Sequence, residues 1–226
     1  MYMDMCPEWE KRGACTDREC TTCPRLRSGI HEYLNLLDEA EQIAGVKHAF
    51  IGSGLRYDLI PPDEGCLNHI LRHISGQMKV APEHITKTVT RAMNKPDINH
   101  FDRFRKAFEK SQDGKKPRQY LVPYLMSGHP GCTIRDMISL AEYLRDTGLY
   151  TRQVQDFTPA PLTASTSMYA TGLDHRTGKP VHVPKGREKK IQRAILHWKD
   201  PANYQLVLEG LTIAGERTWL EIKRVV

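Results

Sequence analysis

Polar residues follow four short apolar runs of the sequence, 46–51, 78–81, 120–126 and 153–157, at places where strands would end. In sheets of parallel strands, ligands bind beyond the strand ends. Glycine, proline and capping residues at these places also have a purely structural explanation, since every strand-to-helix turn needs them. Charged groups are costly there unless they meet a ligand or one another. We therefore predict one functional rim formed by Arg56, Asp58, Lys79, Glu83, His84 and His129.

Cysteines form a second candidate site near the start of the chain. The first 15 residues contain no apolar run of a secretory signal, so we expect a cytoplasmic, reducing environment in which disulfides are disfavoured. Four thiolates can complete a tetrahedral zinc site or hold an iron–sulfur cluster. Their spacing is not that of two C-x2-C knuckles, and a loop with reduced thiols remains the alternative. The four candidate ligands are Cys6, Cys15, Cys20 and Cys23.

Other reactive side chains give weaker signals. Cys132 follows Gly131 near a predicted helix N-terminus, where a thiolate is stabilised, but a small loop residue is the preferred interpretation. Four further histidines are expected on solvated surfaces: His31, His48, His69 and His73.

The positive charge is concentrated in one segment. Residues 176–199 hold eight basic residues against Glu188 alone, whereas the net charge of the whole chain is +6. The remainder is therefore close to neutral. Such a patch indicates phosphate, nucleic acid or an acidic partner, although it is most often a solvated face. No RNP-type stacking motif accompanies it, so a nucleic-acid role is open but unsupported.

Helix-period and strand-period runs alternate from residue 28 onward, which predicts βα units and a parallel sheet. Ser28 is expected to cap the first long helix and Gly45 to end it, and Thr133 to Asp136 form a capping box. Pro123 interrupts the third strand, which is unusual in a central strand. Four strands are half of an eight-stranded barrel, so the fold class is α/β with a partial parallel barrel.

The pattern changes after residue 158, where turn formers dominate as far as residue 188 and indicate an ordered excursion or a linker. Helices are expected at 188–198 and 201–214. We therefore divide the chain into a Cys-rich segment (1–27), a partial barrel (28–162) and a basic linker with a helical extension (163–226). No stretch approaches the roughly 20 apolar residues of a membrane helix.

Four segments carry a resemblance to a known family: SGLRYDL, KVAPEHITKTVTRAMNKP, YLVPYLMSGHPGCTIRDMISLAEYL and QVQDFTPAPLTASTSMYATG. They resemble the later part of YgiQ-like radical S-adenosylmethionine proteins, and the resemblance covers nearly the whole chain, to about Gly215. SGHPGCT and VQDFTPAP also resemble the fifth-strand turn and the sixth strand of radical methylthiolating enzymes. The resemblance implies that the four runs are strands three to six of a TIM-like barrel.

The resemblance also implies cofactors and roles. Such enzymes hold a [4Fe–4S] cluster through C-x3-C-x2-C and cleave S-adenosylmethionine to a 5′-deoxyadenosyl radical. Glu83 and His84 would lie near the ribose or methionine of the cofactor, and the bend containing Ser127, Gly128 and Gly131 near its adenine. The other rim residues, Arg56, Asp58, Lys79 and His129, would face the unknown substrate.

The sequence departs from the family pattern in the motif that binds the iron–sulfur cluster. C-x3-C-x2-C is absent, and the nearest run, Cys15-x4-Cys20-x2-Cys23, is one residue longer and precedes the wrong strand. The resemblance therefore implies that this chain is the C-terminal portion of a longer protein, whose upstream part holds the cluster and is its first partner. The alternatives are a non-catalytic module that binds metal and RNA or a protein partner, or a fragment inactive alone.

Overall fold

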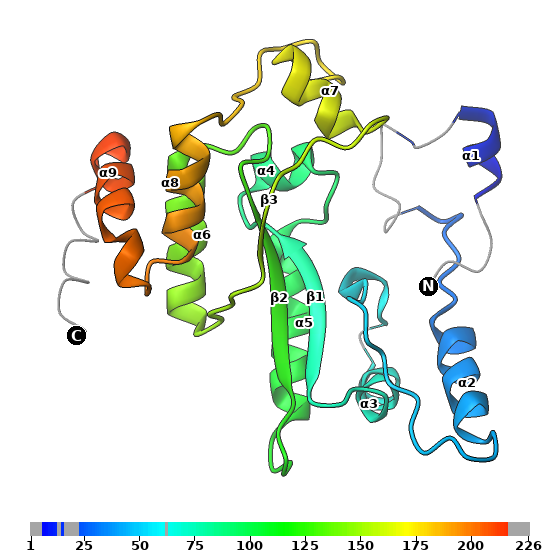
Figure 1. The fold of residues 1–226 in the computed structure, drawn as a ribbon. Helices are drawn as coiled ribbons and strands as arrows, with labels where there is room; N and C mark the ends of the chain where they lie inside the picture. Colours follow the sequence, from blue (N-terminus) through cyan, green and yellow to red (C-terminus); the bar gives the residue numbers. More distant parts are fainter. Residues whose placement is uncertain (1–5, 13–14, 16–22, 62, 217–226) are drawn as a thin grey trace. The chain divides into compact units, whose positions relative to one another are not determined.

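The computed structural model describes residues 6–12, 15, 23–61 and 63–216 (Figure 1). Its described strands form one small parallel sheet in the order β1-β2-β3. They are β1 (Gln77–Glu83), β2 (Tyr120–Ser127) and β3 (Val154–Asp156). In the register of β2 and β3, Leu125 lies opposite Val154 and Ser127 opposite Asp156. The α/β class and the parallel strands are confirmed, but the described strands do not form a barrel.

The predicted strand at 46–51 is wrong. Its amides are already used: Ile51 donates to the carbonyl of His73 at 2.8 Å, and Ala49 donates to Glu41 Oε1 at 3.0 Å. Only an isolated parallel bridge, between Leu55 and Val80, lies nearby. The apolar run therefore lies along a helix end instead of joining the sheet ladder.

Pro123 is tolerated in the central strand because β3 is short. The pairing with β3 covers only Leu125 to Ser127, so Pro123 lies before that ladder begins. Its missing N–H therefore costs no hydrogen bond to β3.

Helices account for most of the regular secondary structure in the described residues. Before β2 they are α1 (Pro7–Arg12), α2 (Ile30–Glu41), the 3-10 helix η2 (Tyr57–Leu59), α3 (Glu64–Arg72), α4 (Lys87–Ala92) and α5 (Ile98–Ser111). After β2 they are α6 (Ile134–Thr147), α7 (Ala164–Thr171), α8 (Arg187–Leu196), the 3-10 helix η3 (Pro201–Asn203) and α9 (Tyr204–Ala214).

Of the two helix N-caps predicted from the sequence, the one of α6 is confirmed and the one of α2 is wrong. The capping box of α6 is confirmed, because Thr133 Oγ1 accepts from the Asp136 amide and the Asp136 carboxylate accepts from the Thr133 amide. Ser28, however, does not cap α2. That helix begins after Gly29, and the Ser28 hydroxyl donates to the carbonyl of Leu59 at 3.2 Å.

Helix α7 lies inside the segment that was predicted to be an excursion or a linker. The segment is ordered, but not without secondary structure: Thr163 accepts from the amide of Thr166 and begins the helix, and Gly172, with φ of 70°, ends it. Only Met168 of α7 is buried. The helix has no apolar period to reveal it, so sequence reading missed it.

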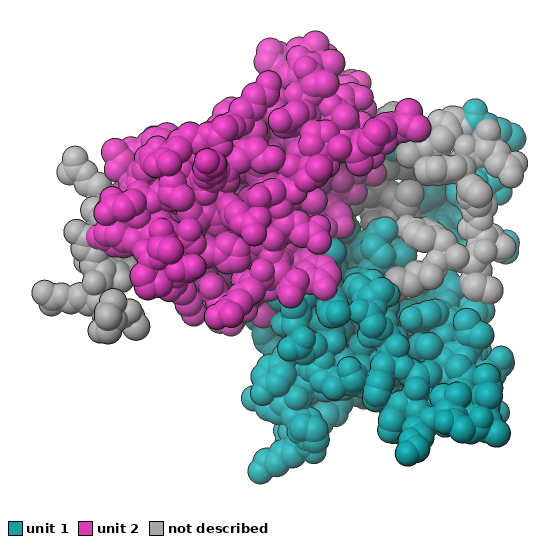
Figure 2. Space-filling view, in the orientation of Figure 1, with its two compact units in different colours: residues 1–82, 96–123 teal, residues 83–95, 124–226 magenta. Residues whose placement is uncertain are grey.

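The chain divides into two compact units, each made from two segments (Figure 2). Unit 1 contains residues 1–82 and 96–123, and unit 2 contains 83–95 and 124–226. In unit 1, α5 packs against α3 and η2, and Phe101 meets Tyr57 edge to face. In unit 2, α6, α8 and α9 pack together around a core that also takes in Val89 and Leu125.

Gly210 allows the close approach of α9 to α8 within unit 2. A Cβ at this position would lie 2.8 Å from Ile191 Cγ2 and 3.0 Å from Ile195 Cδ1. We expect Gly210→Ala to lower the free energy of unfolding by about 1–2 kcal/mol, because overpacking outweighs the better helix propensity of alanine. Urea unfolding measures this, with exposed Thr212→Ala as the control. A stabilised Gly210→Ala protein would show that the contact is looser than described.

None of the described helices is long and apolar enough to cross a membrane.

Candidate functional site

Each strand of the sheet ends on a residue with a side-chain oxygen. β1 ends at Glu83, β2 at Ser127 and β3 at Asp156, and all three belong to unit 2. The ends of parallel strands lie at one edge of a sheet, which is where such folds bind ligands. Around these ends lies a group that we call the strand-end cluster: His84, Ser127, His129, Cys132, Asp156 and Gln192.

Ser127 and Asp156 are tied together. The Ser127 hydroxyl donates to Asp156 Oδ1 at 2.5 Å, and Arg193 of α8 donates to Oδ2 at 2.8 Å. Burial alone would raise the pKa of Asp156, but these two hydrogen bonds hold it below its ordinary value. The end of β3 therefore carries a fixed negative charge whose orientation depends on β2 and α8.

His84 and Cys132 form a buried neutral pair. The Thr86 amide donates to His84 Nδ1 at 3.1 Å, so the ring proton is on Nε2, which lies 3.6 Å from Cys132 Sγ. Burial lowers the pKa of His84 to about 4, an effect that nearby His129 reinforces and Asp136 opposes. Burial and the charges of Asp136 and Glu188 raise the pKa of Cys132. The imidazole donates to the sulfur and cannot remove its proton, so Cys132 is not an activated nucleophile.

Gln192 links α8 to the turn after β2. Its Oε1 accepts from the Gly128 amide and its Nε2 donates to the Cys132 carbonyl, both at 2.9 Å, and its side chain is completely buried. Gly128 adopts a φ of 74°, and a Cβ there would lie 2.8 Å from the side chain of Lys189. Sequence reading missed Gln192 because a single polar residue on an apolar helix face gives no pattern.

His129 is held inside unit 2. Its Nε2 lies 2.8 Å from Ser165 Oγ of α7, its Nδ1 donates to the Pro130 carbonyl, and the ring meets Phe157 edge to face. Burial lowers its pKa, which the hydrogen bond to Pro130 partly opposes. The residue is only 2% exposed, so its contact with a substrate stays a prediction that would require α7 to move.

Glu83 differs from its neighbours because its carboxylate is loosely held. Lys95 Nζ lies 3.5 Å from Oε1, and burial raises the pKa of Glu83 although Lys95 opposes the change. Its backbone has a φ of 64°, which is strained for a glutamate. Such strain is frequent where a side chain must reach a ligand. Gly131, the last of the predicted cofactor contacts, donates its amide to the carbonyl of His182.

The other predicted rim residues belong to unit 1. Arg56 donates to both carboxylate oxygens of Asp58, from Nε at 2.8 Å and from Nη2 at 2.5 Å. Lys79 donates to the carbonyl of Gly52 at 3.1 Å. The structure therefore gathers the predicted cofactor contacts and His129 in unit 2, whereas Arg56, Asp58 and Lys79 lie in unit 1.

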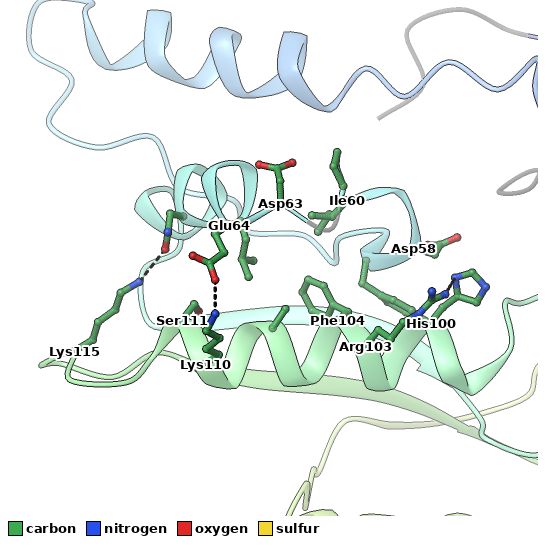
Figure 3. A pocket seen from close by; sticks show the side chains of 15 residues that line it. Asp58, Ile60, Asp63, Glu64, His100, Arg103, Phe104, Lys110, Ser111 and Lys115 are labelled. Atoms are coloured by element: carbon green, nitrogen blue, oxygen red, sulfur yellow. Dashed lines mark hydrogen bonds and ion pairs between the residues drawn. The ribbon is translucent and has the colours of Figure 1, made fainter.

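Asp58 also lines a cavity of about 660 Å³ in unit 1 that sequence reading did not identify (Figure 3). Apolar side chains such as Phe104 line it, and charged side chains surround them, among them Lys110, which pairs with Glu64 at 2.6 Å. Its volume lies in the range of small-molecule sites. No motif marks it, because its lining comes from η2, α3 and α5 together.

The N-terminal cysteines are only partly described. Cys6, Cys15 and Cys23 are free and half-buried, and Cys20 lies outside the described residues. In the described part of the chain these three thiols are not gathered at ligating distance. The four-cysteine metal site therefore stays a prediction.

Much of the basic segment is used within unit 2. Arg187 pairs with Glu209, Arg193 with Asp156, and Lys189 donates to the carbonyl of Phe157. Arg176 donates to the carbonyl of Arg91 in α4 and so anchors the excursion. These contacts give the positive charge a structural role, and nucleic-acid binding stays a prediction.

Comparison with known proteins finds relatives along almost the whole chain. It is 51% identical over 220 residues to a UPF0313 protein of Methanosarcina acetivorans, 43% over 210 residues to one of Clostridium perfringens and 42% over 223 residues to one of Geobacter sulfurreducens. These matches cover 95%, 90% and 96% of this chain but only 30%, 32% and 37% of the relatives. The chain thus spans about a third of the length of the relatives it matches. Residues 152–220 match a domain of unknown function, DUF3362.

Proposed function

We propose that a chain similar over nearly its whole length to UPF0313 proteins forms the C-terminal portion of a cytoplasmic radical S-adenosylmethionine enzyme. UPF0313 is the YgiQ-like family, which is the family that the four sequence segments resemble. The matched relatives are about three times as long as the matched region, which leaves ample sequence for a cluster-binding part. That upstream part is the first partner of this chain, and the substrate is unknown.

The observation that carries the proposal is the placement of oxygen-bearing side chains at all three strand ends: Glu83, Ser127 and Asp156. A carboxylate at a strand end can accept hydrogen bonds from ribose hydroxyls or from the ammonium group of a methionine moiety. Glu83 has the loosest pairing of the three and is the residue that we assign to cofactor binding. The Ser127–Gly131 bend is held rigid by Asp156 and Gln192, which suits a surface on which a planar base rests.

The residues of this chain do not fit the iron–sulfur cluster itself. The C-x3-C-x2-C ligands are absent from the sequence, and the described cysteines do not form a group of ligands. In the proposed enzyme the rest of the longer protein would hold the cluster, which would supply reducing power for the cleavage of S-adenosylmethionine. This chain would bind and orient the nucleoside and exclude water from it.

The test uses a complete protein. The full-length UPF0313 protein of Methanosarcina acetivorans is reconstituted anaerobically with iron and sulfide, and 5′-deoxyadenosine is measured after addition of S-adenosylmethionine and a reductant. A chimera that carries this chain in place of the matching segment of the relative then tests the residues. We expect Glu83→Gln in the chimera to raise the KM for S-adenosylmethionine about tenfold or more, and Glu109→Gln on exposed α5 to leave it unchanged. A cluster-loaded protein that forms no 5′-deoxyadenosine would contradict the proposal.

A further inference from the structure

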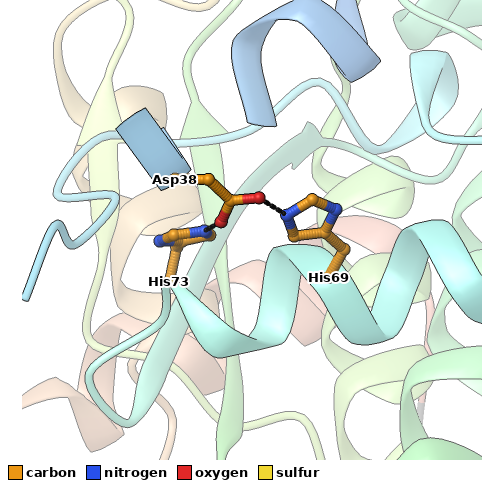
Figure 4. A group of neighbouring side chains, drawn as sticks. All are labelled: Asp38, His69 and His73. Carbon is orange, nitrogen blue, oxygen red and sulfur yellow. Dashed lines mark hydrogen bonds and ion pairs between the residues drawn. The ribbon is translucent and has the colours of Figure 1, made fainter. Parts of the chain in front are cut away.

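Three side chains of unit 1 that could ligate a metal ion lie close together (Figure 4). Asp38 of α2 lies between two histidines, with its Oδ2 at 2.8 Å from His69 Nε2 and its Oδ1 at 3.1 Å from His73 Nε2. All three ligand atoms lie within 4.8 Å of one another. We call these residues the histidine–aspartate cluster. They correct the prediction that His73 is a solvated surface residue, since its side chain is completely buried, whereas the side chain of His69 is 26% exposed.

The two imidazoles come from the C-terminal end of α3, where His69 lies in the last turn and His73 is the C-cap residue. The two residues are four positions apart and their ring centroids lie 5.8 Å from each other, a separation at which two histidines can hold one ion. The carboxylate comes from α2, which packs against α3 within the same unit. Two histidines and one carboxylate are a ligand set of transition-metal ions that leaves further positions open.

The tautomer of His73 is the second observation. Its Nδ1 lies 2.9 Å from the carbonyl oxygen of Ala49, which can only accept, so Nδ1 carries a proton. In the neutral ring the Nε2 lone pair then faces the Asp38 oxygen, which is also an acceptor. Two acceptors 3.1 Å apart need a proton or a metal ion between them. A carbonyl behind the ligating imidazole is the usual support of a metal-binding histidine.

We propose that the histidine–aspartate cluster binds one divalent transition-metal ion, with Zn²⁺ as the reference ion. Ligands at 2.0–2.2 Å from zinc lie about 3.3 Å apart in a tetrahedron, so small side-chain shifts suffice. Glu41 supports the site from behind, because its Oε1 lies 3.7 Å from His73 Nδ1 and accepts from the Ala49 amide. The ion would join α2 to the C-terminal end of α3.

One contact opposes the ion. Arg72 donates to Asp38 Oδ1 at 2.8 Å, so its positive charge competes for the same oxygen. The Arg72 side chain is 61% exposed and can move away into solvent. Metal binding and the Arg72–Asp38 ion pair are therefore alternatives. Removing the arginine charge in Arg72→Gln should increase the metal affinity, whereas loss of a ligand should decrease it.

The test is titration of the whole chain with Zn²⁺ by calorimetry, in a background in which Cys6, Cys15, Cys20 and Cys23 are serine so that thiolates cannot take the metal. We expect one Zn²⁺ per chain. His69→Gln and Asp38→Asn should each weaken the affinity about 100-fold, and the exposed His31→Gln on α2 should not change it. Co²⁺ should give ligand-field bands without sulfur-to-metal charge transfer.

Folding is checked separately, because His73 is buried and its replacement can unfold the unit. Asp38→Asn and His69→Gln affect half-exposed side chains, so their circular dichroism in the absence of metal should match that of the parent. Failure of Zn²⁺ to bind, or binding that survives these two substitutions, would overturn the proposal. A Zn²⁺ affinity that Arg72→Gln leaves unchanged would also contradict the proposal.

Discussion

Replacing Gln192 with methionine is expected to lower the free energy of unfolding by about 3 kcal/mol. Methionine keeps the length of the side chain, but it offers neither the acceptor used by the Gly128 amide nor the donor used by the Cys132 carbonyl. Both backbone groups then stay buried without a partner, and each such loss costs about 1–3 kcal/mol. Urea unfolding followed by circular dichroism measures the change.

The matched control is Lys190→Met, which is exposed on the same helix and should change stability by no more than about 0.5 kcal/mol. Gln192→Glu offers a second comparison, because the ionised carboxylate keeps the acceptor for the Gly128 amide but has no donor for the Cys132 carbonyl and buries a charge. At a pH low enough to protonate the carboxyl group, its O–H can replace the lost donor, so the variant should approach the stability of wild type at the same pH. If Gln192→Met is as stable as Lys190→Met, the link between α8 and the strand-end turn contributes nothing.

Acidification is expected to destabilise the protein through His84. The pKa of His84 is about 4 in the folded state and 6.5 ordinarily, because burial disfavours the charged ring. Between these values the unfolded state binds the proton and the folded state does not, so stability falls as the pH decreases. The free energy of unfolding is unaffected by His84 well above pH 6.5, and it falls by about 2 kcal/mol between pH 7.5 and pH 5.

The measurement is the free energy of unfolding in urea at pH 7.5 and at pH 5. His84→Gln should remove most of the pH dependence, whereas His31→Gln, at an exposed position, should keep it. Burial also lowers the pKa of His129, so the His84→Gln variant should keep a weaker dependence of its free energy of unfolding on pH. A wild-type slope that His84→Gln leaves intact would place the acid sensitivity elsewhere.

Local signals in the sequence predicted much of this fold. Thr133 and Asp136 form the expected capping box, and the helices expected at 188–198 and 201–214 are found close to those bounds as α8 and α9. These features depend on a few neighbouring residues, so the sequence suffices to identify them. The grouping of His84, Ser127 and Gly131 in one unit also follows from strand-end logic, although their cofactor role stays a prediction.

Three of the errors share one physical cause, which is competition for hydrogen bonds by distant residues. The run at 46–51 is apolar enough for a strand, but Glu41 and the end of α3 take its amides. Ser28 has the right type for a helix cap, but its hydroxyl serves Leu59. His73 looked like a surface residue until α2 and the carbonyl of Ala49 enclosed it. Such partners are 8 to 31 residues away or come from another helix, beyond the reach of local patterns.

The interleaving of the two units limits how the protein can be cut into pieces. The chain passes from one unit to the other after residues 82, 95 and 123, so a single protease cleavage cannot release either unit whole. The DUF3362 span, 152–220, contains α8 and α9 but not α6, against which both helices pack. A recombinant fragment trimmed to that span would expose to water the apolar side chains of α8 and α9 that pack against α6, and would bind hydrophobic dyes, so sequence-family borders are a poor guide to soluble expression here.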